Sequence, residues 1–468
     1  MSNNTSRRRK TRITALTLAL GIALATGAPA LAQTEPVPTP QQTHWQNLEF
    51  GVMVHFGLKT YVNKEHDDGH LSARLFNPAH ADPDQWAAAA KAAGAKYLIL
   101  VARHGDGFAL WPTSTSHYSV ASSPWKHGHG DLVRLTEQAC RKYGLGFGIY
   151  LAPSDTHYFI THPQATTADY EKVYLRQLDE LASNYGPLVE WWFDGSGPKD
   201  FDFGRAVTEL RTFQPNTQIF AAVNVTPHAT IRWVGNEAGR IEGTNWNAIT
   251  SHDQRRWLPV EVDTPLQTRD QWYWHTDSQP RSLDSLLTVW DHSVGRGGQL
   301  LMGLSPDRDG RLPAADVARL EQFGRALKAR YGIAHDLALH HASVPKDAAN
   351  VPHDPARATD GDTATMWSSA YRHQGRLTVT FTQPTTIDTA LTMEWLVDGQ
   401  HVRDYRIQAR VDGHWRTLVQ GHAIGHEKID HFAPVTTREV RLDILDSNAR
   451  AHIREFELFD DKPLAPQA

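Results

Sequence analysis

Short apolar runs that alternate with amphipathic helical patterns fill most of residues 43–335, and this alternation restricts the fold more than any other feature. Repeated strand–helix units indicate parallel strands joined by right-handed crossovers. An open doubly wound sheet usually has a glycine-rich phosphate-binding turn after its first strand, whereas this chain has His-Phe-Gly-Leu at 55–58. The sequence therefore predicts an α/β fold with a closed, TIM-like (β/α)8 barrel.

The pattern changes after residue 335. Short alternating apolar segments follow without a long helical pattern, and they lie at 377–381, 389–395, 403–411, 439–445 and 455–459. This spacing is typical of an antiparallel β-sandwich or jelly roll. We therefore expect the barrel to occupy 43–335 and an all-β sandwich to occupy 336–468.

The first 32 residues have the three parts of a signal peptide. A basic stretch at 7–12 precedes an apolar stretch at 14–25, and Ala-Leu-Ala follows at 30–32. The apolar stretch is too short for a membrane-spanning helix. We expect cleavage after Ala32, a linker over 33–42, and a periplasmic or secreted protein without stable membrane insertion. Whether export follows the general or the twin-arginine route stays open.

Charge and cysteine content narrow the class of protein further. The chain has a net charge of −5, and because residues 1–32 hold five basic and no acidic side chains, the mature chain would carry −10. An acidic exported protein is a poor candidate for binding nucleic acid. The single cysteine, Cys140, cannot form an internal disulfide and lies in a helical pattern, so we expect it to be buried and inert.

Polar residues at the ends of predicted strands mark the candidate site, because such ends face one pocket in a barrel. A Trp-Trp-Phe-Asp-Gly run places Asp194 at the tip of an apolar strand, and Glu237 lies in a glycine-flanked loop after another. His55, His104 and Tyr150 stand near the ends of three further strands. These five side chains are expected to converge.

Two carboxylates suit the cleavage of a glycosidic bond, in which one attacks the anomeric carbon and the other protonates the leaving oxygen. Asp194 is the better nucleophile because it lies at a strand tip, and Glu237 could reach over as the acid. Competing carboxylates are Glu242, Glu65 and Asp263. A His-Gly-His sequence at 127–129 is a weaker signal for a metal site. The sequence has no HExxH, CxxC or Gly-x-Ser-x-Gly motif, which disfavours zinc proteases and α/β-hydrolases.

Taken together, these segments resemble the α-L-fucosidase family of retaining glycoside hydrolases, glycoside hydrolase family 29. The segment around Glu237 resembles the branch that cleaves α-1,3 and α-1,4 linkages. The matching stretches run through the predicted barrel in order, at 50–57, 103–113, 192–195, 232–239, 272–275 and 294–296.

The resemblance implies an exported exo-α-L-fucosidase that releases L-fucose from fucosylated oligosaccharides or glycoconjugates and needs no cofactor for catalysis. Asp194 would be the nucleophile and Glu237 the acid/base of a double displacement. The resemblance also implies a sugar-binding group, which consists of His55, Glu65, His66, His104, Tyr150, Trp192 and Arg232.

Several positions depart from the family pattern. A glycine stands where the family has a second histidine, which removes a partner for a sugar hydroxyl. The departures are Arg103 for lysine, Gly105 for histidine, His66 and Ser154 for tryptophan, and Gly303 for asparagine. Two alternatives therefore stay open, namely a related glycosidase such as an α-L-galactosidase and a non-catalytic carbohydrate-binding homologue.

The segment Ala-Thr-Asp-Gly-Asp-Thr-Ala-Thr at 358–365 is similar to a turn of the discoidin, or coagulation factor 5/8 type C, family. In that family the turn commonly holds a structural calcium ion, which would here involve Asp360, Asp362 and Thr365. An ordinary Asp-Gly turn is the alternative. The module would either bind sugar or serve as a scaffold.

Overall fold

The computed structural model describes residues 35–195, 197–221, 227–343 and 354–460. The expected signal peptide at 1–32 lies outside the described residues. Within these ranges, no helix combines the length and the apolar character that crossing a lipid bilayer requires.

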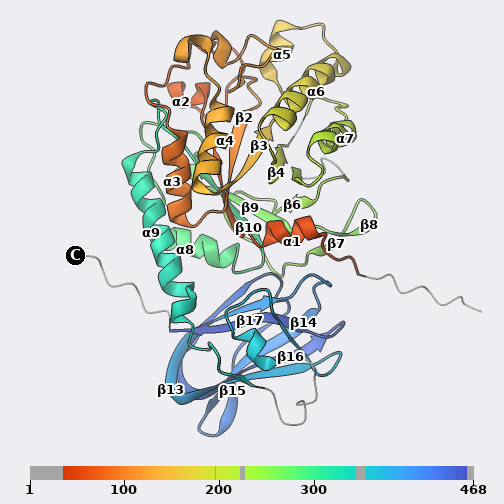
Figure 1. The fold of residues 1–468 in the computed structure, drawn as a ribbon, viewed down its shortest axis with the longest axis vertical. Helices are drawn as coiled ribbons and strands as arrows, with labels where there is room; N and C mark the ends of the chain where they lie inside the picture. Colours follow the sequence, from red (N-terminus) through yellow and green to blue (C-terminus); the bar gives the residue numbers. More distant parts are fainter. Residues whose placement is uncertain (1–34, 196, 222–226, 344–353, 461–468) are drawn as a thin grey trace, which may run out of the picture. The chain divides into compact units, whose positions relative to one another are not determined.

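Eight strands close into a parallel barrel, in the order β1-β10-β9-β6-β5-β4-β3-β2 (Figure 1). Every neighbouring pair is parallel. The predicted barrel is therefore confirmed. Its strands are β1 (Phe50–Val54), β2 (Tyr97–Arg103), β3 (Gly146–Leu151), β4 (Glu190–Phe193), β5 (Gln218–Ala221), β6 (Ile231–Trp233), β9 (Val260–Pro265) and β10 (Gln299–Leu304).

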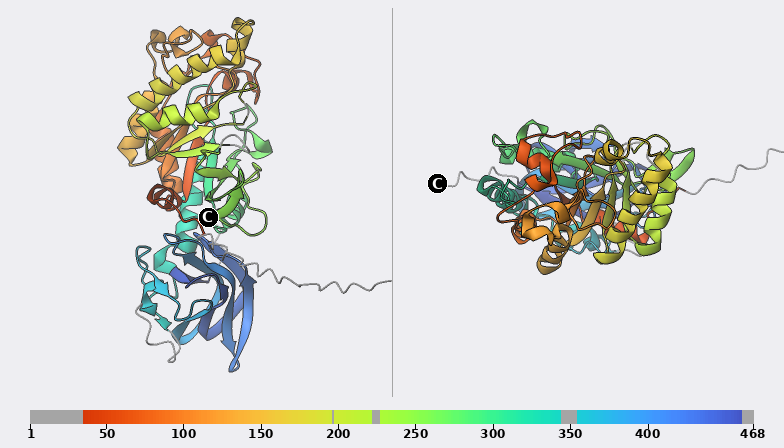
Figure 2. Two further views of the ribbon diagram at one scale, coloured as in Figure 1. Left: turned by 90° about the vertical axis from the view of Figure 1, so that its right-hand side faces the viewer. Right: turned by 90° about the horizontal axis from the view of Figure 1, so that it is seen from above.

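Helices lie on the outside of the barrel, as the view from above shows (Figure 2). The helix α3 shows how the sequence sets their ends: Asp82 accepts a hydrogen bond from the backbone of Gln85 at its start, and Gly94 adopts a left-handed conformation at its end. Cys140 is buried in α4, as expected. The helices are α1 (Pro40–Gln46), α2 (Leu58–Val62), α3 (Pro83–Ala93), α4 (Leu132–Tyr143), α5 (Thr156–Thr161), α6 (Thr167–Asn184), α7 (Phe203–Phe213), α8 (Leu283–His292) and α9 (Ala314–Tyr331).

The barrel is irregular on one side. Between β6 and β9 the chain forms a two-stranded antiparallel hairpin, β7 (Ala248–Ser251) and β8 (Gln254–Trp257), where a regular barrel would have a helix. The long connection that contains this hairpin also carries Glu237.

Apolar side chains pack on both surfaces of the barrel wall. All seven residues of β2 are buried, which explains why the barrel strands read as continuous apolar runs in the sequence. One cluster fills the space between strands and helices, and a second fills the barrel interior with Met53, Tyr97, Ile99, Tyr150 and Trp192 among its members. The interior cluster forms the floor beneath the strand ends.

The C-terminal module is an antiparallel sheet structure with its own apolar core, as predicted. The apolar segments at 377–381 and 389–395, expected as separate strands, belong to one long strand, β13, that carries β-bulges. The strands are β11 (Ala342–Ser343), β12 (Trp367–Ser368), β13 (Gly375–Glu394), β14 (Val402–Val411), β15 (His414–Gly421), β16 (Lys428–Ser447) and β17 (His452–Phe459).

Candidate active site

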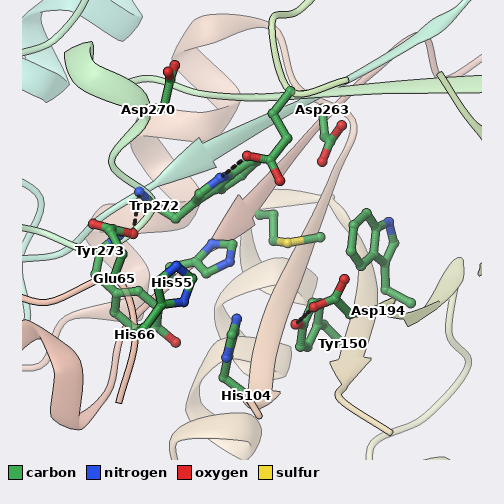
Figure 3. Close-up of a pocket in the computed structure, with 13 residues that line it drawn as sticks. His55, Glu65, His66, His104, Tyr150, Asp194, Asp263, Asp270, Trp272 and Tyr273 are labelled. Atoms are coloured by element: carbon green, nitrogen blue, oxygen red, sulfur yellow. Dashed lines mark hydrogen bonds between the residues drawn. The ribbon is translucent and has the colours of Figure 1, made fainter. Parts of the chain in front are cut away.

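A cavity of about 270 Å³ opens where the barrel strands end (Figure 3). Its walls combine carboxylates, imidazoles and aromatic rings, the mixture expected where a polar ring with an apolar face must be held. The lining residues are Met53, His55, Glu65, His66, His104, Tyr150, Trp192, Asp194, Glu237, Asp263, Asp270, Trp272 and Tyr273.

Asp194 follows directly on β4, and Tyr150 of the neighbouring strand β3 holds it. The Tyr150 hydroxyl donates a 2.6 Å hydrogen bond to Oδ2 of Asp194. Burial and the nearby negative charge raise the pKa of Tyr150 well above its usual range, so the phenol stays protonated and remains a donor. The contact fixes one carboxylate oxygen of Asp194 and leaves the other for chemistry.

A stack of flat side chains supports Asp194 from below. The Tyr150 ring lies nearly parallel to Trp192, with 5.4 Å between ring centroids, and Trp192 stacks on Phe220 at 3.8 Å. The indole Nε1 of Trp192 donates a 2.7 Å hydrogen bond to Oε1 of Glu261, which is wholly buried inside the barrel. The pocket floor is therefore tied to the barrel interior.

His55 follows β1 and His104 follows β2, and both rings are neutral. Burial, together with the positive charge of Lys59, lowers the pKa of His55 to about 3 and that of His104 well below its usual value. The His104 ring stacks on Tyr150, with planes 13° apart. Neutral imidazoles can donate at one nitrogen and accept at the other, which suits recognition of hydroxyl groups.

Glu65 and His66 reach the cavity from the loop after α2. The Glu65 carboxylate accepts hydrogen bonds from the backbone nitrogens of Trp272, at 3.0 Å, and Tyr273, at 3.2 Å. Glu65 therefore fixes the loop after β9 across the cavity. His66 lines the same wall but is exposed to solvent.

Glu237 enters the cavity from the loop after β6 and is exposed. Its Oε2 accepts a 2.9 Å hydrogen bond from the indole Nε1 of Trp272. The competing carboxyl Asp263, within β9, is 3 % exposed and accepts a 2.6 Å hydrogen bond from Trp233. Burial raises the pKa of Asp263 well above its usual range, which disfavours the charged carboxylate that a nucleophile needs.

Two further candidates from the sequence lie apart from the cavity. Arg232 directs its guanidinium to the carbonyl oxygen of Leu258 and to Oδ1 of Asn245, and it does not line the cavity. Glu242 is exposed and pairs with Arg240. The structure therefore does not bring Arg232 into the sugar-binding group or Glu242 next to Asp194.

Two departures from the family pattern lie next to each other. A Cβ atom at Gly105 would lie 2.8 Å from Oγ of Ser154, so any larger side chain at 105 would meet this serine. Neither residue lines the cavity. The lost imidazole at 105 and the lost indole at 154 are thus one local change.

Sequence reasoning did not include Met53, Asp270, Trp272 and Tyr273 in the site. Trp272 and Tyr273 lie in a Trp-Tyr-Trp run after β9, and their position after a barrel strand was the available signal. Met53 lies within β1 and Asp270 within a surface loop, and neither has a sequence pattern that separates it from its neighbours.

The described ranges hold no group of three or more His, Cys, Asp or Glu side chains that could bind a metal ion. In the 358–365 turn, the Thr365 hydroxyl donates to Oδ2 of Asp360 at 2.9 Å, while Oδ1 of Asp362 accepts from the backbone of Ala364. Glu455 of β17 lies beside this turn and is fully buried, with the backbone of Gly361 and the carboxyl of Asp360 as its polar neighbours. Burial and the charge of Asp360 raise the pKa of Glu455 to about 8.

Comparisons with known proteins agree with this architecture. The α-L-fucosidase family model matches residues 67–332, and the F5/8 type C domain model matches 341–456. α-L-Fucosidase 1 from Arabidopsis thaliana is 28 % identical over 91 % of this chain and 88 % of its own length.

Solved structures share the fold over almost the whole chain. The crystal structure of SpGH29 is 30 % identical, with a TM-score of 0.83, and covers 91 % of this chain and 98 % of its own. A Ruminococcus gnavus GH29 fucosidase in complex with fucose is 23 % identical, with a TM-score of 0.82 over 92 % of this chain and 96 % of its own, a likeness of fold. With a barrel, a strand-end cavity and a family match over most of the barrel, this chain belongs to the α-L-fucosidase family of glycoside hydrolases and carries a C-terminal F5/8 type C domain.

Proposed function

We propose that this protein is an exported, retaining exo-α-L-fucosidase. The single observation that carries the proposal is that Asp194 and Glu237, from different barrel loops, line one small cavity together with neutral histidines and aromatic rings. A cavity of about 270 Å³ suits one terminal sugar residue, with the rest of the glycan outside.

In the first step, a carboxylate oxygen of Asp194 attacks the anomeric carbon while Glu237 gives its proton to the leaving glycosidic oxygen. The anomeric C–O bond breaks, and a fucosyl ester on Asp194 forms. In the second step, Glu237 takes a proton from water, the water oxygen attacks the anomeric carbon, and Asp194 leaves as a carboxylate. The hydrogen bond from the Tyr150 hydroxyl holds the Asp194 carboxylate in position for the attack.

A panel of aryl glycosides tests the activity. We expect turnover of an aryl α-L-fucoside with little turnover of the β-anomer. Faster turnover of the aryl α-L-galactoside would favour the α-L-galactosidase alternative, for which Gly105 is the motivation. No turnover of any member, with binding of L-fucose retained, would mean a carbohydrate-binding homologue.

The variant Asp194→Ala tests the nucleophile directly. We expect kcat to fall by about 10⁴-fold or more, because the covalent intermediate can no longer form. Azide should restore part of the activity and yield the glycosyl azide of inverted configuration. A variant that retains most of its activity would show that another group attacks the sugar.

We further propose a preference for α-1,3 and α-1,4 linkages, on the basis of the sequence around Glu237. Oligosaccharides with α-1,2, α-1,3, α-1,4 and α-1,6 fucose, compared by kcat/KM, test this. Faster cleavage of the α-1,2 or α-1,6 compounds would contradict it. Export with cleavage after Ala32 is likewise a proposal, and N-terminal sequencing of the protein recovered outside the cytoplasm tests it.

We further propose that the 358–365 turn holds a structural calcium ion. Asp360, Thr365 and the buried carboxyl of Glu455 would supply hard oxygen ligands, as calcium prefers, whereas Asp362 is turned to the backbone. When bound, the ion would neutralise the buried Glu455 carboxylate and so stabilise the module.

Thermal unfolding with calcium or with a chelator tests this site. We expect calcium to raise the unfolding temperature of the wild type but not of Glu455→Gln. Glu439→Gln is the matched control, because Glu439 belongs to the same sheet and pairs with Arg410 at the surface. The same calcium response in all three proteins would contradict the proposal.

A further inference from the structure

Lys59 is a buried lysine directly behind the cavity wall. It lies in α2, which begins three residues after His55, and only 2 % of the residue is exposed. The amine Nζ lies 2.9 Å from Nδ1 of His104 and 3.1 Å from the carbonyl oxygen of Glu65. It also stands 4.3 Å from the centroid of the Tyr273 ring. Three walls of the cavity therefore meet at this one amine.

Two contacts of this amine suit a positive charge. The carbonyl oxygen of Glu65 accepts its hydrogen bond, and the face of the Tyr273 ring attracts a cation. Burial lowers the pKa of Lys59, and the negative charge of four carboxyl groups opposes this shift only in part; they belong to Asp106, Glu65, Asp67 and Asp194. An ammonium group has three donors and no acceptor.

For the ammonium form of Lys59, the short contact with His104 has one reading. Because the ammonium can only donate, Nδ1 of His104 must accept, and the imidazole carries its hydrogen on Nε2. Figure 3 shows the His104 ring directed into the space between the other lining residues. No hydrogen-bond partner of Nε2 is found among the residues with described positions.

We propose that Lys59 is a positioning residue of the sugar subsite, whose ammonium holds His104 in the Nε2–H tautomer so that the imidazole donates a hydrogen bond to a sugar hydroxyl. This inference rests on the proposed function of the cavity. A lysine that served only to anchor the Glu65 loop would leave the tautomer of His104 undetermined. A neutral amine could either donate to Nδ1 or accept from Nδ1–H, so hydrogen on Nδ1 is compatible only with the neutral amine.

The tautomer can be measured in the wild-type protein without a ligand. In histidine labelled with ¹⁵N, two-bond ¹H–¹⁵N couplings distinguish Nδ1–H from Nε2–H, and a spectrum of His104→Gln assigns the signal. We expect a neutral ring with hydrogen on Nε2 at pH 7. Hydrogen on Nδ1 would overturn the proposal, whatever the enzyme cleaves.

Kinetics of Lys59→Met give the second test, with Lys64→Met as the matched control, because Lys64 is exposed in the same loop region and has no role in the cavity. We expect KM for an aryl α-L-fucoside to rise about tenfold in Lys59→Met while kcat changes less than about threefold, because a contact to the bound sugar is weakened. Unchanged KM in Lys59→Met would overturn the proposal.

Sugar analogues show whether His104 acts as a donor. Fluorine accepts a weak hydrogen bond but cannot donate one, whereas a deoxy position does neither. We expect wild-type protein to bind one monofluoro-L-fucose more tightly than the matching deoxy sugar, and Lys59→Met to lose that preference. If neither protein binds L-fucose, the proposed function fails while the NMR measurement still decides the role of Lys59.

Discussion

The mouth and the interior of the barrel both hold carboxyl groups, in opposite surroundings. At the mouth, Asp194 is half-buried and Glu237 is exposed, and both line the cavity. In the interior, Glu190 and Glu261 have no exposed surface, and indole groups donate to both. Burial raises the pKa of Glu190 to about 7, and burial with the charge of Glu190 raises that of Glu261 well above its usual value.

The difference shows that carboxyl groups have two different roles in the same barrel, according to whether they lie at its mouth or in its interior. A carboxyl group that faces the cavity at a strand end can attack the substrate or exchange a proton with it. Two carboxyl groups buried side by side bind a proton more readily than exposed ones, and here they accept hydrogen bonds from neighbouring indoles. Trp192 connects the mouth of the barrel with its interior, because it donates a hydrogen bond to Glu261 and stacks beneath Tyr150.

The largest effect is expected at the mouth, for Glu237→Gln. The amide cannot protonate a leaving group, so kcat for an unactivated fucosyl disaccharide should fall about a thousandfold. For an aryl fucoside with a very acidic leaving group, the loss should be far smaller. Glu242→Gln is the control, because Glu242 is exposed and pairs with Arg240. An equal fall of kcat in Glu242→Gln would show that Glu237 is not the acid/base.

Glu261→Ala tests whether the buried carboxyl groups of the barrel interior stabilise the fold. The change leaves the Trp192 and Tyr97 donors without their acceptor, so the free energy of unfolding should fall by about 3 kcal/mol. Glu261→Gln keeps an oxygen acceptor and should lose much less. Denaturant unfolding measures both. An alanine variant as stable as wild type would show that the buried pair contributes nothing to the fold.

The pH dependence of the free energy of unfolding tests the interior carboxyl groups separately from those at the mouth. The folded state binds a proton at Glu190 that the unfolded chain releases above its ordinary pKa of 4.5, so this contribution is present at low pH and is lost as the pH rises from 4.5 to about 7. Glu261 acts in the same direction. Between pH 5 and 7 we expect wild type to lose about 1.5 kcal/mol more stability than Glu261→Gln. Parallel curves would mean that the pair does not titrate in this range.

The smallest effect is expected for Trp272→Phe, which keeps an aromatic ring but removes the donor to Glu237. Loss of one hydrogen bond of about 1 kcal/mol should lower kcat/KM about fivefold. Trp274→Phe is the control, since Trp274 lies outside the cavity lining. Equal kinetics for the two variants would show that the indole does not position the acid.

The amount that sequence could predict differs between residues of the same site. Asp194, His104 and Tyr150 were found because each ends or follows a buried strand, and parallel strands bring such ends together. Trp272 and Lys59 were not found, because their roles depend on contacts across the cavity between loops that pack together only in the folded protein.

The sequence by itself determined the barrel, the β-module and the family, since these follow from local periodicity and from motifs that are contiguous along the chain. Only the tertiary structure decided which carboxyl groups meet water and which are buried, which side chain faces His104, and that Glu455 lies beside the 358–365 turn. The physical reason is that protonation and hydrogen-bond roles depend on burial and on neighbours distant in sequence. The local sequence pattern reveals neither the burial nor these neighbours.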